Sequence, residues 1–593
     1  MKRIKFVTIS NHLMGGQWLP AAAGNIIYHL QQNEYIRNNF TFLPIESENN
    51  CLDKKEFLED LDNTDILCIT NYAWNQELND IIAKKFKTRN VAGIVVYGGP
   101  NVPKFFNDIV EFVESRFYVD YFFTGPGEKS FESFLMEGFI RNENGAYCHN
   151  TYDTFDHTAI DYNGLQLKPE EYPKPIQSKL YDHIFNNKEY DNIGVPLEGT
   201  RGCPYSCSFC DWGGQSNGKI VKFDTDDVLN EISIALKYDS VKFIELCDAN
   251  YGIYERDVDI IKHIAENKNK LKSVIFSGVA KNGSKHIDEI YSVVTENFPL
   301  VLNETKVSLQ TLNEDVLKLN KRSNISTEKL LKQLHSSTVP IKTAELIIGL
   351  PGETGKSWED TIFQTVGMGF SSLRIHRLFL SPNILLNDVD FQRENDIKCL
   401  SVKIPRLYLN HSVEDLEIKK YDTETLSVDD GIFEKFKTIS HCKSFNSDEM
   451  VKMYKVTLWY KLFIETKLLL PIFDSKLSSD LLEANYYMFL DNLNKMPFIN
   501  SLFQDVLNRV RYIFSQDEIV LNSLKDSNYF LYLISSEKYH IFKNIEIVKS
   551  EFKNIYNYQS LDYFNEIQTK LLSNSDKHPW KVYKLKSPHT MPQ

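Results

Sequence analysis

The sequence lacks three features that would set it apart from ordinary globular enzymes. Cysteine is scarce, with nine in 593 residues, so a secreted framework of disulfide bonds is not expected. No run of about 18 or more apolar residues occurs, so no membrane-spanning helix is expected. Positive charge is in deficit, because 67 Lys and Arg stand against 80 Asp and Glu. The net charge of −13 argues against a broad nucleic-acid surface, although it leaves room for a local basic groove.

Internal repeats and low-complexity tracts are also missing, and the composition is that of a folded protein. Hydrophobic residues make up 42% of the chain and charged residues 25%, which excludes disordered and fibrous classes. At about 150 residues per domain, the length indicates roughly four domains, with three as a minimum. The apolar run after the basic N-terminus is too short for a signal-peptide core. We therefore expect a cytoplasmic protein whose thiols stay reduced and free to bind metals.

Residues 1–145 alternate the patterns of strands and helices. Helices are predicted at 21–32 and 79–87, and strands at 4–10, 65–70, 93–97 and 118–124. Such alternation is typical of a Rossmann-like, doubly wound parallel sheet, which binds ligands outside the carboxyl ends of its strands. Gly98-Gly99-Pro100 and Gly125-Pro126-Gly127 follow two of these strands, where the backbone turns sharply or approaches a ligand.

The rest of the chain divides into three parts. The polar, proline-bearing segment 146–190 is interpreted as a linker. Residues 191–395 predict a partial (β/α)6 barrel, with strands at 194–198, 241–246, 273–277, 305–310, 342–348 and 373–380. Residues 396–593 predict a mainly helical domain, with amphipathic helices at 451–470, 480–494 and 498–514.

Three cysteines within eight residues form the most specific pattern. Cys203, Cys207 and Cys210 have the spacing C-x3-C-x2-C directly after a predicted strand. Thiolates are the usual ligands of iron–sulfur clusters, and three of them leave one iron of a four-iron cluster open to another ligand. The alternatives to an iron–sulfur cluster are a zinc site and ordinary buried thiols without a metal. A structural zinc ion takes four ligands, and apart from Cys247 on another strand no Cys or His follows before His263.

With Phe209 before the last cysteine, this loop resembles the C-x3-C-x-aromatic-C signature of radical S-adenosylmethionine (SAM) enzymes. Similar segments follow along the predicted barrel, among them Glu245-Leu246-Cys247-Asp248-Ala249-Asn250, Ser308-Leu309-Gln310-Thr311, Lys321-Arg322-Ser323-Asn324 and Gly349-Leu350-Pro351-Gly352. The N-terminal part resembles the cobalamin-binding domain of class B radical SAM methylases, in Tyr72-Ala73-Trp74-Asn75, Gly98-Gly99-Pro100 and Gly125-Pro126-Gly127-Glu128. The resemblance covers about residues 1–390.

The resemblance implies three cofactors, namely a [4Fe-4S] cluster, SAM and cobalamin. It assigns the cluster to Cys203, Cys207 and Cys210. For SAM it implies Phe209, Asp248, Asn250, Ser308, Gln310, Arg322 and Gly349, with the hydroxyl, amide and guanidinium groups facing the ribose and carboxylate. For cobalamin it implies Tyr72, Trp74, Asn75, Gly98, Gly99, Pro100, Gly125, Gly127 and Glu128.

Several of these residues have an ordinary structural alternative that the sequence leaves open. Arg322 also fits a surface charge on a helix, Asp248 and Asn250 fit turn chemistry, Gly349 fits a strand-to-helix turn, and Trp74 fits a core residue.

One further histidine is a candidate ligand of cobalt. Ser10-Asn11-His12-Leu13-Met14-Gly15 departs from the D-x-H-x-x-G cobalamin motif, since Ser10 replaces the Asp that would orient the imidazole. His12 is therefore either a cobalt ligand or a loop histidine, and cobalamin binding without a protein ligand is the alternative.

The function that the resemblance implies is C-methylation of an unactivated carbon of a specialised metabolite or peptide, through a 5′-deoxyadenosyl radical and methylcobalamin. The C-terminal domain would close over the barrel and shape the substrate pocket. A radical rearrangement, ring contraction or cyclisation without methyl transfer is the alternative, and a non-catalytic iron–sulfur or cobalamin sensor is an alternative of another class. Expected partners are a small-molecule or peptide substrate and a flavodoxin- or ferredoxin-type reductant.

Overall fold

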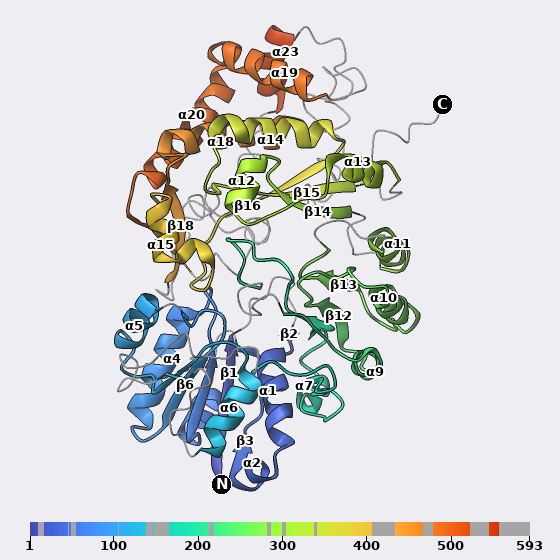
Figure 1. Ribbon diagram of the computed structural model, residues 1–593, viewed down its shortest axis with the longest axis vertical. Coiled ribbons are helices and arrows are strands. Elements are labelled where there is room, and N and C mark those ends of the chain that lie inside the picture. The colour runs from blue at the N-terminus through green and yellow to red at the C-terminus, as the bar shows by residue number, and fades with distance from the viewer. Residues whose placement is uncertain are drawn as a thin grey trace.

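The computed structural model describes residues 1–9, 17–45, 47–48, 55–104, 106–137, 146–147, 165–212, 219–280, 286–298, 304–336, 341–405, 433–465, 478–521 and 545–556. An N-terminal α/β unit lies at the bottom of Figure 1, the barrel strands lie at its centre and right, and the C-terminal helices lie at its top. The α/β fold class expected from the sequence is confirmed.

The N-terminal unit is a seven-stranded sheet in the order β3-β1-β5-β6-β7-β8, with β4 also paired to β1. Every pairing except β7–β8 is parallel. Its strands are β1 (Lys2–Ile9), β3 (Phe40–Phe42), β4 (Ser47–Glu48), β5 (Ile66–Thr70), β6 (Ile94–Gly98), β7 (Tyr121–Phe123) and β8 (Ala146–Tyr147). All five residues of β5 are buried, as expected for a parallel strand covered on both faces.

Helices cover both faces of this sheet. They are α1 (Ala21–Gln31), α2 (Glu34–Asn39), α3 (Lys55–Asp62), α4 (Gln76–Arg89), α5 (Phe106–Glu114) and α6 (Gly127–Met136). Because side chains alternate along a strand, Leu67 and Ile69 pack with α3 and α4, whereas Ile66 and Cys68 point to the opposite face. The core on that opposite face, which includes α1 and α6, continues into the first strands of the barrel.

The barrel consists of two parallel half sheets. The first has the order β13 (Ser273–Phe276), β12 (Val241–Leu246), β9 (Ile193–Leu197), β2 (Gln17–Trp18), and the second has the order β14 (Glu304–Gln310), β15 (Ile341–Ile348), β16 (Ser372–Arg377). Strand β2 comes from the N-terminal part of the chain and was not predicted. Trp18 lies opposite Gly194, where a Cβ would stand 2.5 Å from the indole ring, so glycine is required at this position.

Helices pack outside the barrel strands, and a short hairpin precedes them. The helices are α9 (Thr225–Ala235), α10 (Arg256–Glu266), α11 (Ile287–Asn297), α12 (Glu314–Leu319), α13 (Thr327–Ser336) and α14 (Gly355–Gly367). The hairpin is formed by β10 (Thr200–Arg201) and β11 (Val221–Lys222), which pair antiparallel on either side of the cysteine loop.

The segment predicted as a linker is packed in its described part. Residues 165–190 contain the short helix α7 (Asp182–Phe185), and Tyr172, Ile176, Tyr181 and Ile184 are buried in the core that joins the N-terminal sheet to the barrel. The apolar side chains between the prolines therefore connect the two units. The domain limits drawn from the sequence stay a prediction.

The C-terminal region is mainly helical, with α15 (Val389–Glu394), α18 (Ser447–Trp459), the π-helix η5 (Tyr460–Ile464), α19 (Ser479–Asn492), α20 (Pro497–Phe514), α23 (Ile545–Tyr556) and two 3-10 turns, η4 (Leu385–Asn387) and η7 (Leu493–Lys495). These helices share one core with β14, β15 and β16. A three-stranded sheet in the order β18 (Phe433–His441), β17 (Lys398–Pro405), β19 (Glu518–Val520) was not predicted. Within the ranges given above, no helix is long and apolar enough to cross a membrane.

Candidate active site

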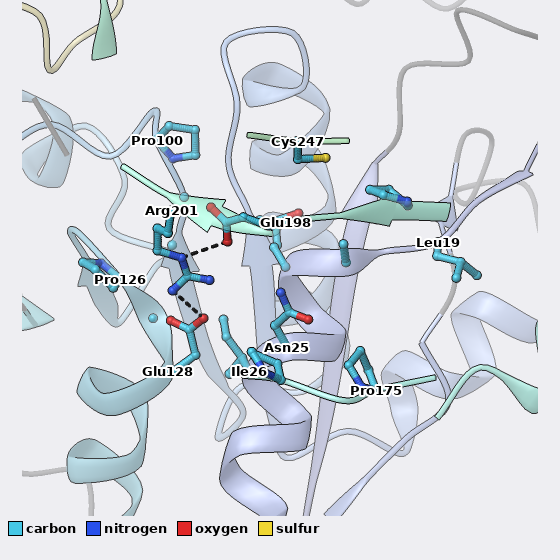
Figure 2. Close-up of a pocket in the computed structure, with 18 of the residues that line it drawn as sticks. Leu19, Asn25, Ile26, Pro100, Pro126, Glu128, Pro175, Glu198, Arg201 and Cys247 are labelled. Atoms are coloured by element: carbon cyan, nitrogen blue, oxygen red, sulfur yellow. Dashed lines mark hydrogen bonds and ion pairs between the residues drawn. The ribbon is translucent and has the colours of Figure 1, made fainter. Parts of the chain in front are cut away.

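A cavity of about 720 Å³ lies between the carboxyl ends of the N-terminal strands and the first half of the barrel. Its lining on the N-terminal side includes residues predicted to bind a ligand, namely Tyr72, Trp74, Gly98, Gly99, Pro100, Gly125, Gly127 and Glu128. The barrel side contributes Glu198, Arg201, Gly202, Trp212, Glu245, Cys247 and Ser277. Figure 2 shows Pro100, Pro126 and Glu128 on the left side of the view, Glu198 near its centre and Cys247 toward its top.

The loop after β6 needs glycine for its shape. Gly99 has a φ of +109°, and a Cβ there would lie 2.6 Å from the carbonyl oxygen of Asn71. No other residue fits such a close backbone approach between the loops after β5 and β6. Gly127 begins α6, and a Cβ there would lie 2.8 Å from the side chain of Ile26. The glycines thus let the loops pack tightly around the cavity.

The loop after β5 presents two stacked aromatic rings to the cavity. The ring centroids of Tyr72 and Trp74 are 4.5 Å apart with an interplanar angle of 13°, and Trp74 is 36% exposed. Trp74 is therefore not a core residue. Asn75 does not line the cavity: it is buried, its Oδ1 accepts from the Tyr72 backbone N–H at 2.8 Å, and its Nδ2 donates to the Thr70 carbonyl at 3.3 Å. Asn75 holds the loop that carries the two rings.

A buried ion triad connects the two sides of the cavity. Arg201 donates through Nη1 to Glu128 Oε1 at 3.0 Å and through Nε to Glu198 Oε2 at 2.9 Å (Figure 2). Burial lowers the pKa of Arg201, but the two carboxylates outweigh it, so the net pKa lies above the usual arginine value. Glu128 was predicted as a ligand-binding residue, whereas the structure also gives it this role between α6 and the barrel. Arg201 and Glu198 were not predicted.

The cysteine loop is held at both ends. Gly202 has a φ of +92°, which lets the chain turn directly after β10. Arg256 donates through Nη2 to the Gly199 carbonyl at 2.6 Å and through Nη1 to the Phe223 carbonyl, so it fixes both arms of the hairpin. Ser208 donates through Oγ to Asn320 Oδ1 at 2.8 Å, which attaches the loop to the second half of the barrel.

The three cysteines of this loop differ in burial. Cys203 and Cys207 are buried and Cys210 is half-buried. Within the part of the chain that the structure describes, no three His, Cys, Asp or Glu side chains gather as they would around one metal ion. In a four-iron cluster each thiolate binds its own iron, so its sulfurs need not converge on one point. The assignment of these thiols to an iron–sulfur cluster stays a prediction.

Two side chains direct N–H groups at these sulfurs. Asn250 Nδ2 donates to Cys203 Sγ at 3.0 Å, and Arg322 Nη1 lies 4.0 Å from Cys207 Sγ. Arg322 also donates through Nη2 to the Ser308 carbonyl and is 5% exposed, so it is not a surface charge. The structure therefore brings Cys203 together with Asn250, and Cys207 together with Arg322 and Ser308.

Two buried amide oxygens near the carboxyl ends of barrel strands accept no hydrogen bond from the described residues. Asn250 Oδ1 and Gln310 Oε1 have no hydrogen-bond partner among the described residues, although the two side chains are only 6% and 8% exposed. Gln310 also has a φ of +67°, a strained value for a side chain of this size. A buried acceptor without a donor is costly, so both oxygens fit a ligand that donates hydrogen bonds.

Three further predicted residues have different surroundings. Asp248 Oδ2 accepts from the Gly199 backbone N–H at 3.0 Å, and burial, with the charge of Glu198, raises the pKa of Asp248 to about 7. Phe209 is partly buried against the core of the second half barrel. Gly349 has a φ of +85°, and a Cβ there would lie 3.2 Å from Met450 in α18. His12 lies outside the described residues.

Comparisons with known proteins agree with this geometry. Residues 197–364 match the radical SAM superfamily. The chain is 29% identical over 408 residues to the cobalamin-dependent radical SAM methyltransferase TokK of Streptomyces tokunonensis, an alignment that covers 65% of this chain and 56% of the relative. Residues 197–364 are therefore similar to radical SAM domains, and the larger alignment agrees with the resemblance to class B radical SAM enzymes.

A second relative and a solved structure are also similar to this chain. The 2-(S-pantetheinyl)-carbapenam-3-carboxylate methyltransferase of Streptantibioticus cattleyicolor is 29% identical over 380 residues, which cover 62% of this chain and 54% of the relative. The chain spans about half the length of the curated relatives it matches. The structure of the cobalamin-dependent S-adenosylmethionine radical enzyme OxsB with aqua-cobalamin bound shares its fold, with a TM-score of 0.50 at 12% identity over 98% of this chain and 83% of that one.

Proposed function

We propose that the protein is a cobalamin-dependent radical SAM methyltransferase that methylates an unactivated carbon of a specialised metabolite or peptide. The observation that carries this proposal is the single cavity lined both by the glycine loops of the N-terminal sheet and by Gly202 of the cysteine loop. Methyl transfer needs a methyl donor and a radical initiator next to one substrate, and this cavity lies where both would meet. The names of the two curated relatives support the same activity.

The residues of the chain would divide the work of binding. Cys203, Cys207 and Cys210 would hold the [4Fe-4S] cluster, and the buried oxygens of Asn250 and Gln310 would accept hydrogen bonds from SAM. When bound, the cluster with SAM supplies radical initiation, and cobalamin supplies a transferable methyl group.

The N-terminal side of the cavity, where we propose that cobalamin binds, is flat and apolar. The stacked rings of Tyr72 and Trp74 offer a flat apolar surface to a macrocycle, and the backbone around Gly99 and Gly125 allows close approach. These apolar walls would also exclude water from the reacting groups. A flavodoxin- or ferredoxin-type protein is the proposed electron donor.

The test is anaerobic reconstitution with iron, sulfide and hydroxocobalamin, followed by incubation with SAM and a strong reductant. Mass spectrometry would follow S-adenosylhomocysteine and 5′-deoxyadenosine, with Cys207→Ala as the control that lacks the cluster. Formation of both products, with methyl transfer to an added acceptor, supports the proposal. The carbapenam carboxylate named for the second relative is the first acceptor to test.

The same measurement separates the alternatives. Formation of 5′-deoxyadenosine without S-adenosylhomocysteine, in the presence of a converted substrate, would favour a rearrangement or cyclisation. Absence of both products from protein that holds cluster and cobalamin would contradict an enzymatic role and favour a sensor.

A further inference from the structure

On the N-terminal side of the cavity, one loop and the first turns of the helices that follow two other loops are each held by one polar side chain from outside the N-terminal sheet. The loops follow β5, β6 and β7 and contain Trp74, Gly99 and Gly125. The side chains that hold them come from β18, from the segment after β16 and from β10. We call the three side chains, Glu434, Asn383 and Arg201, the clamp residues.

Asn383 holds the loop after β6. Its Nδ2 donates to the carbonyl of Pro100 at 2.8 Å and to that of Val102 at 3.0 Å, and its Oδ1 accepts from the backbone N–H of Lys104 at 2.8 Å. The side chain is 3% exposed. Both donor hydrogens and the acceptor of this amide are thus engaged with one short loop, and they fix its position relative to the end of β16.

Glu434 holds the helix that follows the loop after β5. Its carboxylate accepts from the backbone N–H of Glu77 at 2.9 Å and from that of Leu78 at 3.4 Å. These groups lie in the first turn of α4, where backbone N–H groups have no partner within the helix and a negative charge is favoured. Glu434 is fully buried, so strand β18 of the C-terminal region caps a helix of the N-terminal unit.

Arg201 holds the loop after β7 through Glu128, the second residue of α6. All three clamps are directional hydrogen bonds, which fix separation and angle, whereas apolar packing allows surfaces to slide. Two of the clamps bind backbone groups: Asn383 binds the loop after β6, and Glu434 binds the first turn of α4.

We infer that Asn383 and Glu434 are positioning residues that, with Arg201, set the separation between the cobalamin-side loops and the cysteine loop. This inference rests on the proposed function, because the separation matters only where both cofactors act on one substrate. Reacting atoms must lie within about 3–3.5 Å, and a misplacement of about 1 Å costs about 100-fold in rate. Loosening the clamps should therefore impair transfer of the SAM methyl group to cobalamin, which would need both units and would release S-adenosylhomocysteine. Cleavage of SAM to 5′-deoxyadenosine would need only the barrel and should be spared.

The experiment compares Asn383→Ala, Glu434→Gln and the double variant with the reconstituted wild-type protein. Asn395→Ala is the matched control, since its Nδ2 donates to the carbonyl of Phe391 within its own helix. We expect the double variant to keep its iron and cobalamin content and to form 5′-deoxyadenosine within about twofold of wild type. Its formation of S-adenosylhomocysteine should fall about 100-fold.

Two further measurements need no turnover. Hydrogen exchange of the amides of Glu77, Leu78 and Lys104 should accelerate in the variants, which would show that the clamps are released. Pulsed electron paramagnetic resonance on protein with cob(II)alamin and reduced cluster should give a broader distribution of spin separations in the double variant. An unchanged distribution with released amides would overturn the inference, as would undiminished S-adenosylhomocysteine formation.

The outcomes also distinguish this inference from the proposed function. If wild-type protein forms no S-adenosylhomocysteine, the proposed function fails, while the spin separations still decide whether the clamps set the distance. If the variants lose cobalamin itself, the clamps build the binding loops rather than position them, and the inference is wrong.

Discussion

Replacement of Arg201 by methionine should destabilise the protein strongly, because it would leave the buried carboxylate of Glu128 without its counter-ion. The side chain of Glu128 is 5% exposed and that of Arg201 is 17% exposed, so water cannot replace the lost guanidinium at Glu128. The second carboxylate, Glu198, is 26% exposed and would be partly hydrated. Removing one partner of a buried pair costs about 3–5 kcal/mol, most of which is the cost of the remaining buried charge.

This origin of the cost can be tested with a second substitution. In the Arg201→Met/Glu128→Gln protein the orphaned carboxylate becomes a neutral amide, so we expect the double variant to be more stable than Arg201→Met alone by about 1–3 kcal/mol. Lys262→Met is the matched control. Its ion pair with Glu289 has a distance of 2.6 Å, but both side chains are about half exposed, so its loss should cost about 1 kcal/mol or less.

The assay is differential scanning calorimetry of the anaerobic protein. A cost of 3–5 kcal/mol corresponds to a fall in the unfolding midpoint of roughly 6–20 °C for a unit of 150–250 residues. A fall of less than about 2 °C in Arg201→Met, or no recovery on adding Glu128→Gln, would refute the reasoning that the triad is a buried charge network.

Three further predictions concern other parts of the structure. Cys207→Ala should lose most of its cluster iron and all formation of 5′-deoxyadenosine, and normal SAM cleavage would contradict the assignment of the cluster. Gly99→Ala should lower the unfolding midpoint, since its φ is +109°, by the equivalent of about 1–3 kcal/mol, whereas Gly98→Ala, with its nearest atom 3.9 Å away, should not. Burial raises the pKa of Glu353 to about 7, above the unfolded value of about 4.3, so its contribution to stability is full below about pH 4 and is lost as the pH rises through 7. Wild type should therefore lose stability relative to Glu353→Gln between about pH 4 and 7, and a pH-independent difference in midpoint would contradict the shift.

The strands of the parallel sheets could be predicted because their burial leaves a local signature. Strand β12 runs from Val241 to Leu246 as predicted, since a strand covered on both faces reads as a short apolar run. Strand β2 left no such signature, because it is two residues long and is a strand only through its pairing with Ile193 and Gly194. Its existence depends on a partner far along the chain, which local periodicity cannot reveal.

The same distinction applies to the site. The three cysteines and the glycines of the cavity loops could be proposed from the sequence, because a cluster and sharp turns would demand particular residue types at a fixed spacing. Asn383, Asn320 and Arg201 have common side chains whose partners lie 283, 112 and 73 residues away in the sequence. The residues next to them in the sequence do not indicate that they bind such distant partners, so only the folded structure identifies these contacts.

The cysteine loop lies where the two large cores of the molecule meet. One core joins the N-terminal sheet to β9, β12 and β13, and the other joins β14, β15 and β16 to the C-terminal helices. Cys203 accepts a hydrogen bond from Asn250, which follows β12, whereas Cys207 lies near Arg322, which follows β14. A cluster bound to this loop would therefore be held from both halves of the barrel at once. Arg201 attaches the N-terminal unit to the first half of the barrel, and Asn383 and Glu434 attach it to the part of the chain that follows β16. The shape of the cavity therefore depends on the relative position of the two cores.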